Sequence, residues 1–141
     1  MAERISWQSE NVDLPAVDFT RVERWLHRVA ESHGRILDQL GYVFCDDEKI
    51  LEVNRRFLNH DYYTDIITFD YCRGRILRGD MYISLDTVRT NAAGVGESYD
   101  RELHRVIVHG LLHLCGIDDK APGARAIMES HENAALALLS K

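Results

Sequence analysis

Hydrophobic and polar residues along the chain follow two periods, one typical of strands and one typical of helices. Segment 66–71 is rich in β-branched and aromatic residues, which favour strands, whereas segment 16–32 repeats apolar residues every three or four positions, as an amphipathic helix does. The pattern predicts, in chain order, strand 3–8, helix 16–32, strand 35–45 bent near Gly41, helix 46–59, loop 60–63, strand 66–71, strand 79–84, helix 85–93, helix 98–115 and a last helix from Pro122. This order predicts an α+β fold in which a mixed sheet of about four strands packs against helices.

The chain is expected to form a single domain over residues 1–141. It has 141 residues, 45% of them hydrophobic, which is enough to build one core without disulfides. No internal repeat or linker interrupts the pattern, and strands 66–71 and 79–84 are expected to pair as an antiparallel hairpin.

Helix 98–115 is apolar around most of its circumference and should be the most buried helix. It carries His109 and His113, which are four residues apart and therefore project from one face. Gly116 can end the helix in a left-handed conformation, and a sharp turn there could bring Asp119 back toward the histidines. Two imidazoles and one carboxylate, with a fourth position open, are the ligand set of a catalytic zinc site.

The same residues also permit interpretations without a zinc site. Two buried histidines in one helix can also be core residues, but all four ring nitrogens then need partners, because unpaired buried polar groups are costly. Either Asp118 or Asp119 could reach the ion, and Asp119 is preferred because of its spacing from His113; Asp118 is then either a hydrogen-bond acceptor behind the ligands or a turn residue. Cys115 would point away from the histidine face and is expected in the core. The other histidines are expected at the surface or off the ligand face.

The spacing of this motif is that of the metzincin zinc helix, with one omission. Position 110 is glycine, where H-E-x-x-H peptidases carry the glutamate that acts as general base. One zinc ion held by His109, His113 and Asp119 would lower the pKa of a bound water toward about 7 and polarise a phosphoryl or carbonyl oxygen. Without the glutamate, proteolysis is disfavoured, and a substrate that brings its own reactive group, such as the 2′-hydroxyl of RNA, is favoured.

Charge and cysteine content narrow the class of protein. The net charge of −6 argues against a broad nucleic-acid-binding surface. Arg55 and Arg56 form one candidate local basic patch, and Arg73, Arg75 and Arg78 form another. The arginines of either patch can also be ordinary solvent-exposed residues. No apolar run is long enough for a membrane span and the first residues do not form a signal peptide. Three cysteines without C-x-x-C spacing suit a reducing compartment, so a cytoplasmic protein without membrane partners is expected.

Several motifs in fixed order resemble the YbeY family of bacterial rRNA maturation factors. They are Val53-Asn54, then Thr64-Asp65-Ile66-Ile67-Thr68-Phe69, then Gly79-Asp80-Met81-Tyr82-Ile83-Ser84, and finally the zinc-helix motif from His109 to Asp119. The family usually ends that motif with histidine, whereas this chain has Asp119. The family also carries an arginine where this chain has Leu58, so Arg55 or Arg56 is expected to be the phosphate contact here.

The resemblance implies a zinc-dependent, single-strand-specific endoribonuclease with the zinc in a cleft above the buried helix. Its partners would be single-stranded RNA, ribosomal RNA and the ribosome, and its role 16S rRNA 3′-end processing and ribosome quality control. Two alternatives stay open: a metallohydrolase acting on peptides or small molecules, and a non-catalytic ribosome-associated factor in which zinc is structural.

Overall fold

A four-stranded mixed sheet forms the base on which most of the helices lie. The computed structural model describes residues 5–59 and 64–139, and its strands are β1 (Ile5–Ser9), β2 (Ile36–Cys45), β3 (Ile66–Asp70) and β4 (Ile76–Ser84). Their order is β1-β2-β4-β3: β2 runs parallel to both β1 and β4, while β3 is antiparallel to β4. The predicted mixed sheet and the antiparallel pairing of its last two strands are confirmed.

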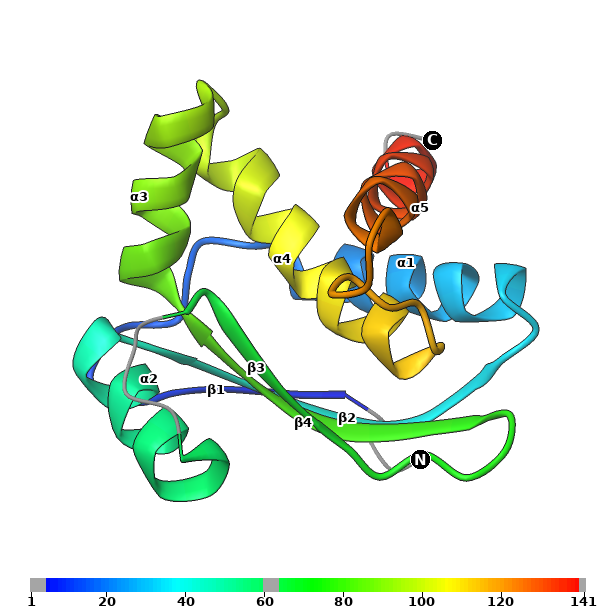
Figure 1. The fold of residues 1–141 in the computed structure, drawn as a ribbon, viewed down its shortest axis with the longest axis horizontal. Helices are drawn as coiled ribbons and strands as arrows, with labels where there is room; N and C mark the ends of the chain where they lie inside the picture. Colours follow the sequence, from blue (N-terminus) through cyan, green and yellow to red (C-terminus); the bar gives the residue numbers. More distant parts are fainter. Residues whose placement is uncertain (1–4, 60–63, 140–141) are drawn as a thin grey trace.

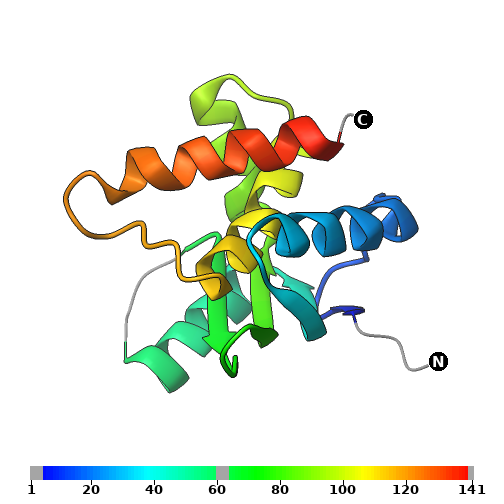
Figure 2. The same cartoon turned by 90° about the vertical axis from the view of Figure 1, so that its right-hand side faces the viewer.

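The helices cover the two faces of the sheet unequally. They are α1 (Phe19–Ser32), α2 (Asp47–Val53), α3 (Leu85–Val95), α4 (Tyr99–Leu114) and α5 (Ala124–Leu139), with a single π turn, η1 (Asn54–Leu58), after α2. Helices α1, α4 and α5 lie on one side of the sheet and α2 on the other (Figures 1 and 2). Across the described ranges, no helix is both long enough and apolar enough to cross a membrane.

Helices α4 and α1 both pack against the sheet, and α5 lies over the two of them. Ten of the 16 residues of α4 are buried, which confirms the prediction that it is the most buried helix. The Tyr42 hydroxyl on β2 donates a hydrogen bond to the carbonyl of Ile107 on α4 (2.8 Å). Trp25 Nε1 of α1 donates to the carbonyl of Ala135 on α5 (2.7 Å). These buried hydrogen bonds fix how the three helices stack over the sheet.

Two glycines allow α4 to approach the sheet closely. A Cβ atom at Gly110 would lie 2.3 Å from Met81 Sδ and 3.0 Å from Ile66 Cδ1. A Cβ atom at Gly79 would lie 2.7 Å from the carbonyl oxygen of Phe69 and 3.0 Å from Leu114 Cδ1. Position 110 therefore faces the sheet, and there is no room there for a glutamate side chain.

The ends and irregularities of some elements differ from the predicted ones. The irregularity in β2 falls between Leu37 and Gln39, not at Gly41, which pairs regularly with Asp80 and leaves room for its carboxylate. Strand β4 begins three residues before the predicted start, and α5 begins two residues after Pro122, since Gly123 has φ +79°. The loop expected at 60–63 and the first residues of the predicted strand 3–8 lie outside the described residues.

The close contact at Gly110 generates a stability prediction. Gly110→Ala should lower the free energy of unfolding by about 1–3 kcal/mol, because the new methyl group overpacks against Met81 and Ile66. Gly94→Ala is the matched control: nothing lies within 4 Å of its Cβ position in α3, so it should be neutral or stabilise by up to about 1 kcal/mol. Urea denaturation of both variants checks this. Equal stabilities for the two would show that α4 does not depend on this contact.

Candidate metal centre and the hollow around it

His109 and His113 occupy successive turns near the end of α4. His109 is half-buried, and its side chain is 21% exposed, whereas His113 is exposed. Helix α4 begins at Tyr99, capped as predicted by Ser98, whose side chain accepts a hydrogen bond from the backbone N–H of Arg101. The helix therefore holds both imidazoles at its C-terminal end.

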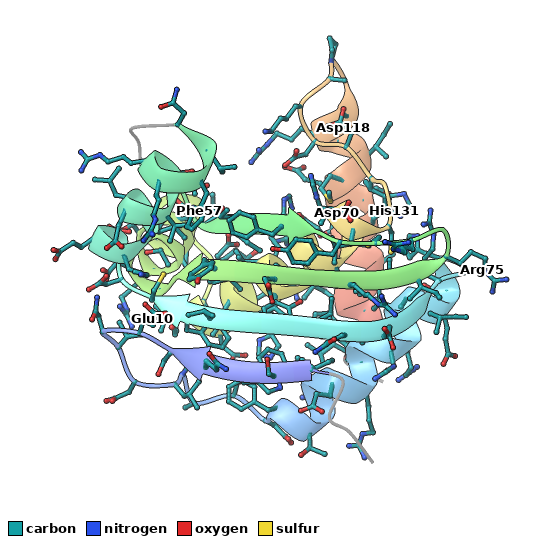
Figure 3. All side chains as sticks on the ribbon, turned by 90° about the horizontal axis from the view of Figure 1, so that it is seen from below. Glu10, Phe57, Asp70, Arg75, Asp118 and His131 are labelled. Carbon is teal, nitrogen blue, oxygen red and sulfur yellow. The ribbon has the colours of Figure 1, made fainter. Side chains whose placement is uncertain are left out.

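The turn after α4 brings a carboxylate back to His109. Gly116 has φ +91°, the left-handed conformation predicted for it, and the N–H of Ile117 closes back on the carbonyl of Leu112. Asp119 Oδ2 then lies 3.3 Å from His109 Nε2. Asp118 is a turn residue, since its carboxylate accepts the backbone N–H groups of Lys120 and Ala121; it is labelled in Figure 3 on the loop between α4 and α5.

The distance between His109 and Asp119 fits two donors that share one ion. Ligands at roughly 2.0–2.1 Å from a tetrahedral zinc are about 3.3 Å apart, although the same separation also suits an ion pair with a protonated imidazole. No group of three or more His, Cys, Asp or Glu side chains within 5–59 and 64–139 is close enough together to hold a metal ion. The structure thus brings together two of the three predicted ligands, while the His113 side chain stays outside the pair.

The other ring nitrogen of His109 is bound to a residue of α5. His109 Nδ1 lies 2.7 Å from Glu132 Oε2, and Arg105 donates to Glu132 Oε1 at 3.0 Å. Burial alone would raise the pKa of Glu132, but the hydrogen bonds from His109 and Arg105 lower it, so the carboxylate stays ionised. For His109, burial opposes protonation, yet Glu132, Asp119 and Asp65 together raise its pKa.

A hollow of about 790 Å³ opens in front of this histidine. It lies among the C-terminal turn of α3, α4, the loop after α4, and α5, and both His109 and Asp119 line it. Six of its lining side chains are carboxylates and two are guanidinium groups: Asp65, Glu97, Glu102, Asp119, Glu129 and Glu132 against Arg105 and Arg125. The hollow therefore carries a negative potential, which attracts cations and repels phosphates.

Asp65, immediately before β3, adds a partly desolvated carboxylate to this hollow. Burial raises its pKa, and the positive charge of His109 offsets only part of that effect. Burial also raises the pKa of Glu102 on α4, and the positive charge of Arg105 offsets part of that effect. Carboxyl groups held near a histidine with raised pKa values are typical of sites that transfer protons.

The arginines proposed as phosphate contacts lie elsewhere. Arg55 and Arg56 line a second hollow at the end of α2, together with Glu48, Leu51 and Glu52. The guanidinium carbon of Arg56 is 5.5 Å from the centroid of the Phe57 ring, and Leu58 is partly exposed beside them. The structure does not bring these two arginines to His109, and their role stays a prediction.

Other residues weighed from the sequence have simple structural roles. Cys115 is buried, as expected for a core residue. His104 is also buried, where its Nδ1 contacts the carbonyl of Asp100. The sequence pattern does not predict Glu132 as part of the site, because α5 follows a loop and no spacing rule relates it to α4; Arg105, four residues before His109 on α4, was also missed, although the helical period places it on the same face. Asp65 does stand in one of the family-like motifs and could have been found there.

Comparisons with known proteins agree over nearly the whole chain. The family model described as "Endoribonuclease YbeY" matches residues 5–140. Proteins of that name are 59% identical in Bacteroides thetaiotaomicron (95% of this chain, 98% of the relative) and 58% identical in Phocaeicola vulgatus (96% and 99%). The solution structure of TM1509 from Thermotoga maritima shares the fold, with a TM-score of 0.68 and 20% identity over 96% of this chain and 88% of that one. The chain belongs to the endoribonuclease YbeY family.

Proposed function

We propose that this protein is a metal-dependent endoribonuclease that cleaves single-stranded RNA during ribosomal RNA maturation, including the 3′ end of 16S rRNA. Membership of the endoribonuclease YbeY family supports the enzyme class and the RNA substrate. The observation that carries the site is the contact of His109 Nε2 with Asp119 Oδ2 inside an acidic hollow.

The proposed ligands of a single zinc ion are His109, His113 and Asp119. His109 and Asp119 both line the hollow, and zinc binding would require the exposed His113 side chain, one turn further along α4, to turn toward that pair. Bound there, zinc supplies a Lewis acid that polarises a phosphoryl oxygen and acidifies water.

The charges of the hollow support the proposal that a cation binds there. Six carboxylates against two guanidinium groups repel an RNA phosphate. Arg105 is held by Glu132 and Glu102, and Arg125 lies near Glu129, so neither guanidinium leaves a net positive patch. A divalent cation bound beside His109 would reverse the local charge and make the approach of a phosphodiester favourable.

The packing of α4 argues against a peptidase using the same residues. The position of the missing peptidase glutamate, Gly110, faces Met81 and Ile66 in the core. A carboxylate could not act from there on a substrate in the hollow. Asp65 is the better candidate for a proton acceptor, since it lines the hollow and its pKa is raised toward the range in which a general base works.

Phosphate contacts away from the hollow, the ribosome as partner and a reducing compartment complete the proposed function. Arg55 and Arg56, beyond the sheet from α4, would contact phosphates of the bound strand away from the cleavage point. Association with the ribosome follows from the proposed substrate. The three cysteines are free thiols, in keeping with the reducing cytoplasm.

Matched substrates test the proposed function. Purified protein loaded with zinc is incubated with one sequence as single-stranded RNA, duplex RNA and single-stranded DNA, and with a peptide pool. Internal cleavage of the single-stranded RNA alone is expected. Turnover of peptide without RNA would support the alternative metallohydrolase, and no turnover with tightly held zinc would support a structural role for the metal.

Removing a ligand should remove the metal. His113→Ala and Asp119→Ala should each reduce zinc in the purified protein to background and abolish RNA cleavage, while Asp119→His should keep the metal, because imidazole replaces carboxylate as a ligand. Elemental analysis and a cleavage assay measure both. Asp118→Ala is the matched control, since Asp118 serves only the turn. Full zinc in Asp119→Ala would show that the third ligand is another residue.

The ionised Asp65 side chain should destabilise the folded protein while supporting RNA cleavage. Because its pKa is raised by burial, ionising it destabilises the fold, so Asp65→Asn should be more stable than wild type at pH 7. The gain should shrink as the pH falls through the raised pKa of Asp65 toward the ordinary value of 3.8, because the carboxyl of the folded protein is then protonated and as neutral as the amide. RNA cleavage should fall by about 100-fold or more. Urea denaturation from pH 4 to pH 7 and single-turnover cleavage check these effects; a less stable, fully active variant contradicts both.

A further inference from the structure

Glu132 connects α5 to the histidine at the centre of the hollow. One of its carboxylate oxygens, Oε2, lies 2.7 Å from His109 Nδ1, and the other, Oε1, accepts a hydrogen bond from Arg105 at 3.0 Å. The Glu132 side chain is only 8% exposed, so water competes little for either contact. We propose that Glu132 is a positioning residue that fixes the tautomer and the ring orientation of His109, an inference that rests on the proposed metal site.

The chemistry of the contact determines which nitrogen of His109 carries hydrogen. An ionised carboxylate can only accept hydrogen bonds, so Nδ1 must be the donor. In the neutral ring, Nε2 is then left with its lone pair, and this is the atom that lies 3.3 Å from Asp119 Oδ2. Glu132 thereby selects the form of His109 that can bind a cation, and directs its lone pair into the hollow.

Arg105 holds Glu132 in place for this task. It donates to Glu132 Oε1 and also to the side-chain oxygen of Asn133 at 3.3 Å, while its Nε lies 3.6 Å from Glu102 Oε1. Arg105 and His109 are four residues apart on α4 and therefore lie on the same helix face, from which each contacts one oxygen of the Glu132 carboxylate. The ring of His109 therefore has little freedom to rotate.

A merely structural role for Glu132 makes a different prediction. If the carboxylate only ties α5 to α4, its loss changes the unfolding temperature but neither the tautomer of His109 nor the affinity for metal beyond a general effect of charge. If it positions His109, both properties change. The tautomer is read from the ¹⁵N chemical shifts of the two ring nitrogens in the metal-free full chain at a pH where the ring is neutral. Zinc affinity is read by competition with a chelator.

Glu132→Ala should shift His109 from the Nδ1–H tautomer toward the Nε2–H tautomer that a free imidazole prefers. It should also weaken zinc binding by about 10–100-fold. Glu132→Gln should shift the tautomer in the same direction, because Arg105 can only donate and takes the amide oxygen, which leaves the amide NH2 group facing Nδ1. The matched control is Glu129→Ala, one turn earlier on α5. Glu129 carries the same charge and lines the same hollow but lies near Arg125 instead of His109.

The proposal is overturned if Glu132→Ala keeps the wild-type tautomer and zinc affinity, or if Glu129→Ala weakens zinc as much as Glu132→Ala does. If Glu132→Ala fails to fold, Glu132→Gln carries the test: a shift toward the Nε2–H form with weaker zinc binding supports the proposal, and an Nδ1–H form with wild-type zinc affinity overturns it. Failure of the proposed function looks different, since the tautomer and zinc affinity would then depend on Glu132 while the wild-type protein cleaves no RNA.

Discussion

The close packing of α4 against the sheet is the constraint on which the site depends. Gly110 lies over Met81 and Ile66, so the helix can sit deep enough to bury more than half of its residues. One face of α4 is thereby committed to the core, and the neighbouring face, with Arg105 and His109, is turned toward α5. The same glycine that permits this approach leaves no room for the glutamate of a peptidase. The close packing of α4 therefore also explains why the site lacks that general base.

Ion pairs and hydrogen bonds then position the side chains of the site on these packed elements. Glu132, from α5, is kept ionised by Arg105 and His109, and in return it orients the imidazole. Asp119 reaches the opposite nitrogen because the left-handed Gly116 reverses the chain directly after α4. The excess of carboxylates in the hollow makes it unfavourable for RNA alone and favourable for a cation, so the proposed metal would link binding of substrate to its own binding.

Local features of the fold and site could be predicted from the sequence, whereas long-range ones could not. Ser98 as a helix cap, Gly116 as a helix end and the one-turn spacing of His109 and His113 follow from rules that act within a few residues. The strand order β1-β2-β4-β3 and the contact of Glu132 with His109 depend on segments far apart in the chain, for which periodicity carries no information. The π turn Asn54–Leu58 also had no sequence signal, and Arg55 and Arg56 lie at a second hollow.

The most direct test of this account is a crystal structure of the zinc-loaded protein with anomalous data collected at the zinc edge. The account predicts a single peak in the hollow, bonded to His109 Nε2, an imidazole nitrogen of His113 and a carboxylate oxygen of Asp119, with Glu132 still hydrogen-bonded to His109 Nδ1. A peak bonded to Glu132 or Asp65 in place of His113, or a peak outside the hollow, would contradict it.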